Sequence, residues 1–244
     1  MVPAFRLRDL VLGYGGRAVL ESGVLDIPPG KVTCVIGPSG TGKSTLLETI
    51  GLMSDTFLST TGPEAAFAIE GEDLDPRTLW ATGRERLAAI RRERFSFIFQ
   101  STNLMPNFTI GENIRVAAHG TGADGALEDR LAVLLDAMRL PRNVLDKPAH
   151  AVSGGQKQRI AFIRALVKDF SILLADEPTG NLDPDNSVAL FSVLKAHLAE
   201  RGRTAVIVTH HLDLAETFGD LVLAIEPRGE GPAAITVRKR PVAS

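Results

Sequence analysis

The 244-residue sequence predicts an α/β fold, and three features of the chain lead to that prediction. A glycine-rich loop joins the apolar run Val32–Ile36 to an apolar helical pattern. Other short apolar runs end in polar residues, as strands do in doubly wound sheets that bind ligands at their carboxyl ends. Residues 109–140 instead show helical periodicity, interrupted at residues 119–125. We therefore expect an α/β core with a helical subdomain inserted into it.

Two strands are expected before the loop, over residues 5–12 and 18–27, followed by a turn at residues 28–30. Tyr14, the only tyrosine, lies between them and is flanked by glycine. An aromatic ring a short distance before a phosphate loop can stack on a purine through its π face. It can equally pack a turn, and its position alone does not distinguish these two roles.

The glycine-rich loop matches the pattern G-x-x-x-x-G-K-[ST] and has the preceding strand and following helix that a phosphate-binding loop requires. Glycines let backbone N–H groups approach phosphate oxygens, and the helix start adds its positive dipole end. We expect Lys43 to contact the β- and γ-phosphates, and the Ser44 hydroxyl to ligate Mg²⁺. The predicted phosphate site consists of Gly37, Pro38, Ser39, Gly40, Thr41, Gly42, Lys43, Ser44 and Thr45.

The segment after this helix contains weaker signals. Residues 51–62 are expected to be irregular, residues 65–70 to form a short strand, and residues 84–94 to form a helix with a solvated basic face. An aromatic strand over residues 95–100 ends at Gln100. A glutamine in this position can ligate Mg²⁺ or hold an attacking water. The alternative is a surface amide, which this segment alone favours.

A second helix start follows the predicted helical subdomain. Ser153 is a good N-cap for a helix that runs through residue 167, and two glycines leave backbone N–H groups bare at its first turn. A capping turn would not need both glycines and the polar residue after them. We therefore expect a second anion-binding helix terminus at Ser153, Gly154, Gly155 and Gln156.

The apolar run that starts at residue 171 ends in two carboxylates, Asp176 and Glu177. A buried strand would bring Asp176 to the carboxyl edge of the sheet as a Mg²⁺ partner, and Glu177 would polarise the water that attacks the γ-phosphate. The alternative is a solvated acidic strand end. The phosphate loop upstream makes that alternative weak.

A histidine pair follows the β-branched run Thr204–Val208. His210 is nearer the strand end and is expected to hydrogen-bond the γ-phosphate, whereas His211 is expected to cap the next helix or to face water. A helix over residues 184–200 precedes this run, and closing strands are expected over residues 220–226 and 233–237.

The bulk composition is that of an ordinary globular protein. Net charge is −2, which gives no general attraction to nucleic acid or to anionic lipid. The single cysteine, Cys34, permits no internal disulfide and is expected to pack in the core. We find no apolar run of the length that a spanning helix needs and no signal-peptide pattern. The sequence therefore predicts a cytoplasmic protein with no nucleic-acid partner and no direct insertion into the membrane.

Together, these motifs resemble those of ATP-binding cassette (ABC) ATPase subunits over nearly the whole chain. Tyr14 is similar to the adenine-stacking aromatic residue, the phosphate loop to Walker A, and Gln100 to the Q-loop. Residues 152–156 are similar to the signature motif, residues 172–177 to Walker B with its catalytic glutamate, and residues 181–183 to the D-loop. His210 is similar to the switch histidine. Within the family, residues 97–113 and 176–183 resemble the lipoprotein-release, macrolide-exporter and cell-division branch.

The resemblance implies a single P-loop NTPase cassette over residues 1–244, with a RecA-like core, an antiparallel β-subdomain and a helical subdomain at about residues 101–165. It implies Mg²⁺ and ATP, with Glu177, His210 and Gln100 as catalytic residues and Ser44, Gln100 and Asp176 at the metal. It also implies a head-to-tail dimer, in which each ATP lies between the Lys43 helix of one copy and the Ser153 helix of the other.

The implied function is that of an ATPase subunit at the cytoplasmic face of the inner (plasma) membrane. It would drive a membrane permease in the export or extraction of lipoprotein, peptide or drug. The alternative is a regulator of the cell-division type, which uses ATP to switch a membrane partner and transports nothing. A soluble ATPase of DNA repair or translation is disfavoured, because the chain has one cassette and no basic surface.

Three features depart from the family pattern. Val152 replaces the usual leucine of the signature motif, and His211 stands where this branch usually has aspartate. Residues 54–89 form a longer segment than usual and lack the common Ser-Gly-Glu pattern. We expect that segment to lie in or beside the antiparallel β-subdomain, where it can contact a partner.

Overall fold

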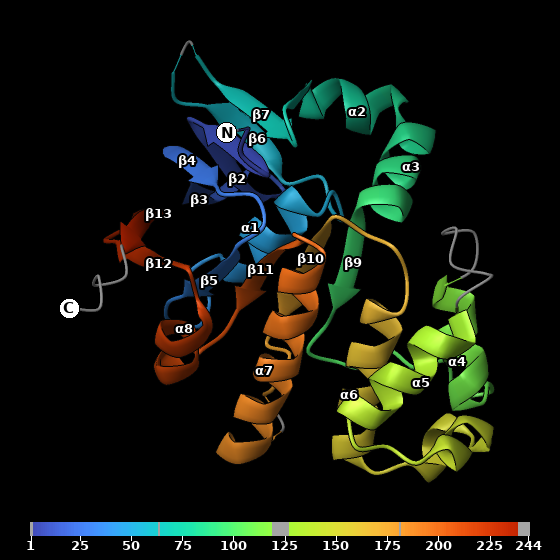
Figure 1. Cartoon of the computed structure of the whole chain (residues 1–244). Helices are drawn as coiled ribbons and strands as arrows, with labels where there is room; N and C mark the ends of the chain where they lie inside the picture. The colour runs from blue at the N-terminus through green and yellow to red at the C-terminus, as the bar shows by residue number, and fades with distance from the viewer. Residues whose placement is uncertain (1, 63, 119–126, 181, 239–244) are drawn as a thin grey trace.

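The computed structural model describes residues 2–62, 64–118, 127–180 and 182–238. It confirms the α/β fold, with two sheets and surrounding helices (Figure 1). In spatial order, the nine-stranded sheet comprises β6 (Phe57–Thr60), β2 (Leu10–Tyr14), β3 (Arg17–Glu21), β13 (Gly231–Arg238), β12 (Leu221–Arg228), β5 (Val32–Ile36), β11 (Thr204–Val208), β10 (Ile172–Asp176) and β9 (Phe95–Ile98). The antiparallel four-stranded sheet comprises β4 (Val24–Ile27), β1 (Phe5–Arg8), β7 (Ala66–Ile69) and β8 (Glu72–Leu74).

Eight α-helices are described. They are α1 (Lys43–Ile50), α2 (Pro76–Thr82), α3 (Arg84–Arg94), α4 (Ile110–Ala118), α5 (Leu127–Ala137), α6 (Gly154–Leu166), α7 (Pro184–Glu200) and α8 (Leu212–Phe218). Two short 3-10 helices, Arg142–Asp146 and Ala149–Ala151, connect α5 to α6. Over the described ranges, no helix combines the length and apolar character that crossing a bilayer requires.

Five neighbouring strands of the large sheet, β12, β5, β11, β10 and β9, are parallel. Their carboxyl ends therefore meet at one edge, which is where the phosphate loop and the polar strand ends were predicted to gather. Parallel strands need cover on both faces, and the side chains of β5 alternate accordingly. Cys34 packs into the core cluster that includes Phe162 of α6 and Phe191 of α7, as predicted for a core cysteine. Val35 packs into the other cluster, with Leu46 of α1.

The predicted N-terminal strands are each divided in two, which corrects the sequence analysis. Asp9 has φ of 52° and separates β1 from β2, and Gly23 has φ of 53° and separates β3 from β4. The two breaks lie side by side, because the Asp9 N–H donates to the Gly23 carbonyl at 2.8 Å and the Leu10 N–H donates to the Ser22 hydroxyl at 3.0 Å. The chain therefore passes between the two sheets twice, from β1 to β2 and from β3 to β4, at adjacent points.

Residues 54–89 are more regular than predicted. The prediction of an irregular stretch was wrong for β6, which pairs with β2 at the edge of the large sheet. Helix α2 begins at Pro76, because Asp75 accepts the Arg77 N–H at 3.1 Å as an N-cap and Pro76 occupies the first helical position. The basic face of α3 is only partly solvated, since Arg91 donates to the Leu52 carbonyl at 2.6 Å.

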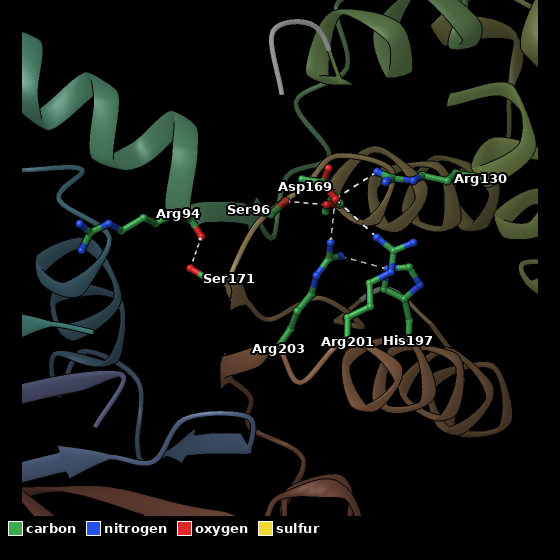
Figure 2. Close-up of polar contacts among 9 residues, drawn as sticks. Arg94, Ser96, Arg130, Asp169, Ser171, His197, Arg201 and Arg203 are labelled. Carbon is green, nitrogen blue, oxygen red and sulfur yellow. Dashed lines mark hydrogen bonds and ion pairs between the residues drawn. The ribbon is translucent and has the colours of Figure 1, made fainter. Parts of the chain in front are cut away.

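Helices α4, α5 and α6 form a group apart from α1 and the antiparallel sheet, and α5 is also tied to the core through an arginine cluster (Figures 1 and 2). Asp169 Oδ1 accepts from Arg130 of α5 at 3.1 Å, from Arg201 at 3.4 Å and from Arg203 at 3.1 Å. Arg203 is 7% exposed and stacks on the Phe170 ring at 4.1 Å. Burial lowers the pKa of Arg203 to about 10.

Replacing Asp169 with asparagine is expected to lower the free energy of unfolding by about 2 kcal/mol. Breaking a buried ion pair costs roughly 3–5 kcal/mol, and the half-open position of Asp169 reduces that cost. Urea unfolding of Asp169→Asn and of Glu128→Gln would measure the effect, since Glu128 accepts from Arg115 at 2.9 Å with both side chains exposed. Equal, small losses in both variants would show that Asp169 does not neutralise the cluster.

Candidate functional site

The phosphate loop leaves the carboxyl end of β5 and enters α1 in a conformation that requires glycine. Gly40 and Gly42 have φ of 77° and 102°, in the left-handed region that favours glycine. A Cβ atom on Gly37 would lie 2.5 Å from the Ile225 carbonyl oxygen of β12. The loop is therefore held against the neighbouring strand at a distance that no other residue permits.

Lys43 is the first residue of α1 and is buried. Its Nζ donates to the loop carbonyls of Gly37 at 2.9 Å and Pro38 at 2.8 Å. The helix has no side-chain N-cap, so the N–H groups of its first turn have no side-chain acceptor. An ammonium group and a bare helix start thus converge on the same loop, an arrangement suited to a multiply charged anion.

Ser44 and Asp176 meet beside this loop, although they are far apart in the sequence. The Ser44 hydroxyl donates to Asp176 Oδ2 at 3.0 Å. Burial, together with the negative charge of Glu177, raises the pKa of Asp176 despite this hydrogen bond. A divalent cation would favour the ionised carboxylate, and oxygen ligands of this kind suit Mg²⁺. Among the described residues, no group of three or more His, Cys, Asp or Glu that could hold a metal ion is found.

The three residues predicted to be catalytic converge on one oxygen. Glu177 Oε2 accepts from Gln100 Nε2 at 3.3 Å and lies 3.4 Å from His210 Nδ1. Glu177 has φ of 44°, an unusual conformation for a residue with a side chain, and its N–H donates to the Val208 carbonyl of β11 at 3.0 Å. Gln100 is exposed, as a surface amide would be, and its side chain contacts Glu177 all the same. Gln100 contacts Glu177 here and not the Ser44–Asp176 pair.

Tyr14 lies at the end of β2, before the turn Gly15–Gly16, and is 43% exposed. Its ring and the loop residues 38–41 line one open cleft of about 660 Å³. Its hydroxyl donates to Glu48 Oε2 of α1 at 2.8 Å. Glu48 was not predicted as a site residue, although it lies one helical turn after Ser44, on the same side of α1.

Ser153 begins α6 as predicted and forms a capping box. Its hydroxyl accepts the Gln156 N–H at 3.3 Å, and the Gln156 side chain accepts the Ser153 N–H at 3.0 Å. Ser153 and Gly154 are exposed. The other end of α6 bonds to the large sheet, where Ser96 of β9 donates to the Ala165 carbonyl at 2.7 Å. Thirteen residues of helix place the Ser153 end about 20 Å from that contact.

The segment after Glu177 contacts α6. Gln158 is buried and donates to the Pro178 carbonyl, which links the helix to the catalytic strand end. His211 occupies the N-cap position of α8, but its side chain forms no cap hydrogen bond. Its ring centroid lies 4.0 Å from that of His210. Asn181 of the predicted D-loop lies outside the described residues.

Replacing Asp176 with asparagine is expected to stabilise the nucleotide-free protein while impairing hydrolysis. A carboxyl group with a raised pKa in the folded state destabilises that state once it ionises, and this cost is absent below the unfolded pKa. The stability gain of Asp176→Asn over the wild type should therefore grow as pH rises through the folded pKa. Urea unfolding in a metal chelator at several pH values would measure it, and a gain independent of pH would contradict this account.

Comparison with known proteins gives a consistent result. The family model described as "ABC transporter" matches residues 20–180. The chain is 38% identical over 230 residues to the lipoprotein-releasing system ATP-binding protein LolD 2 of Caulobacter vibrioides, covering 92% of this chain and 95% of the relative. It is 37% identical to the macrolide export ATP-binding/permease protein MacB of Brucella abortus, covering 90% of this chain but 33% of that protein.

Among solved structures, the dimeric post-hydrolysis state of the cassette MJ0796 bound to ADP and Pi superposes with a TM-score of 0.78 at 28% identity. That match covers 98% of this chain and 100% of the other. A structure of cbiO1 from Clostridium perfringens has a TM-score of 0.79 at 22% identity, covers 99% of this chain and 90% of the other, and supports the fold alone.

Proposed function

The chain belongs to the ABC transporter family as an ATP-hydrolysing, nucleotide-binding subunit, and from this premise we propose that it drives a membrane partner in the export or extraction of a lipoprotein, peptide or drug. The convergence of Gln100 and His210 on Glu177, beside the Ser44–Asp176 pair, is the observation that carries the proposal. The LolD and MacB relatives support the choice of substrate classes.

In the proposed site, the phosphate loop and Lys43 bind the phosphates, and Ser44 with Asp176 holds Mg²⁺. The ion would neutralise charge that develops on the phosphate oxygens. The ring of Tyr14 stacks on the adenine, because it borders the same cleft as the loop. The fold holds each of these groups in place before hydrolysis begins. The protein therefore acts by positioning the nucleotide and by placing charged and polar groups around it.

Glu177 is the proposed general base. Its carboxylate accepts a proton from the water that attacks the γ-phosphate. The accepting atom is Oε2, the oxygen that contacts both Gln100 and His210. These two side chains orient the carboxylate through these contacts. When a γ-phosphate is bound, His210 donates to it, and Gln100 orients the water or reaches the metal.

The Ser153 end of α6 binds the same nucleotide from a second copy in a head-to-tail dimer. Its exposure and its glycine turn support this role. Two positive helix ends then share one γ-phosphate. ATP stabilises the closed dimer only by its greater affinity for that state, and hydrolysis removes this advantage.

Purification of the chain from membranes with its copurifying proteins tests the proposal. The expected partner is an integral permease that holds this subunit at the cytoplasmic face of the inner membrane. Release or export of substrate by the reconstituted complex should require ATP and Glu177. A partner that this ATPase switches without moving any substrate would favour the regulator of the cell-division type.

A further inference from the structure

Glu48 holds the proposed adenine-stacking ring in place. The two-residue turn Gly15–Gly16 has φ of 55° and 82°, a combination typical of a tight hairpin turn that joins β2 to β3. This turn fixes the backbone of Tyr14, a residue that is 43% exposed, but it does not fix the torsions of the side chain. The hydrogen bond of 2.8 Å from its hydroxyl to Glu48 removes that freedom.

Glu48 is well suited to hold the ring, because it lies on α1, the helix that follows the phosphate loop. Burial and the bond to Glu48 raise the pKa of Tyr14, so the hydroxyl keeps its proton and remains the donor at neutral pH. The ring is thereby tied to the element that positions the phosphates.

We propose that Glu48 is a positioning residue for adenine recognition, which acts by holding the Tyr14 ring at the edge of the nucleotide cleft. This inference rests on the proposed role of Tyr14 in stacking. Glu48 touches neither the base nor the phosphates in this role. It sets the fraction of molecules whose ring is ready to stack when the nucleotide arrives.

The size of the effect follows from the number of ring positions. A side chain has three staggered wells about its first torsion. If the bond to Glu48 selects one well, its loss reduces the competent fraction to about one third. The apparent dissociation constant for a nucleotide then rises about threefold. The affinity for an inorganic triphosphate, which has no base, stays the same through this route.

The test compares the affinities for ATP and for tripolyphosphate, both with Mg²⁺, in the full chain. The ratio of the two dissociation constants removes any general effect of the Glu48 charge on phosphate binding. Tyr14→Phe and Glu48→Ala should each weaken ATP about threefold relative to tripolyphosphate. The double variant should show no larger change than either single one, because both remove the same bond. Glu48→Gln should remain close to the wild type, since its amide oxygen still accepts the phenolic proton.

Two further variants separate the possible results. Tyr14→Ala should weaken ATP roughly tenfold or more relative to tripolyphosphate, because a stacked base is lost. Glu85→Ala, at an exposed helical glutamate outside the cleft, should change neither affinity. An unchanged ratio for Glu48→Ala beside a large change for Tyr14→Ala would overturn the positioning role and leave the stacking role intact. An unchanged ratio for Tyr14→Ala would overturn both roles, without affecting the proposal that the chain energises a membrane partner.

Discussion

Glu177→Gln should lower the steady-state rate of ATP hydrolysis by about 10²–10⁴-fold, the usual contribution of a general base. The amide keeps the size of the side chain and can still bond to Gln100 and His210, which now lie 3.3 and 3.4 Å from the carboxylate oxygen. It cannot accept a proton from water. Nucleotide binding and ATP-dependent dimerisation should therefore remain, and the dimer should persist for longer than that of the wild type.

Phosphate release and size-exclusion chromatography with ATP would measure the two effects separately. Glu85→Gln, which removes an exposed carboxylate remote from the site, is the matched control and should hydrolyse ATP normally. Unchanged phosphate release by Glu177→Gln would remove Glu177 from its proposed role. Loss of ATP binding in that variant would instead show that the carboxylate helps to hold the nucleotide.

Ser153→Arg should abolish ATP-dependent dimerisation while the single chain still binds ATP. Ser153 is exposed and lies outside the nucleotide cleft of its own chain, so a long side chain there would obstruct only a second copy. The substitution also removes the N-cap, which costs about 0.5–2 kcal/mol within the chain. Ser153→Thr, which retains the capping hydroxyl, is the control for that local loss.

Gly154→Ala gives a sharper form of the same prediction. A Cβ atom built on Gly154 meets nothing within 4 Å in this chain, and alanine is the better residue for a helix. The monomer should therefore fold normally. Dimerisation should weaken by about five- to 150-fold if a partner's phosphate or backbone fills that space, since overpacking costs about 1–3 kcal/mol. Normal ATP-dependent dimers of both variants would refute the shared site.

The sequence predicted those parts of the fold in which local pattern and tertiary structure agree. The strand Val32–Ile36 is apolar except for Thr33, because the parallel strand is buried on both faces. The helix start at Ser153 was predictable because its capping box lies within four residues. The two divided strands were not predictable, because Asp9 and Gly23 adopt left-handed conformations that bond to each other across the hairpin.

The part of the site that lies at strand ends was also predictable. The prediction was incomplete because it missed Glu48. The ends of parallel strands meet at one edge, so Glu177 and His210 could be predicted to lie at the same edge of the sheet. Glu48 could not, because its partner Tyr14 comes from a hairpin and is 34 residues away in the chain. The relation between Lys43 and Ser153 remains a prediction, since a second copy of the chain would supply one of them.

The central claim is that two copies hold one ATP between the phosphate loop of one and the α6 start of the other. Cysteine cross-linking tests it most directly, because the single native cysteine, Cys34, is buried. Ser39→Cys and Ser153→Cys, each at an exposed position, would be made in separate Glu177→Gln chains and mixed. A short bifunctional thiol reagent should join the two chains with ATP and not without it. Equal cross-linking in both conditions, or none with ATP bound, would contradict the claim.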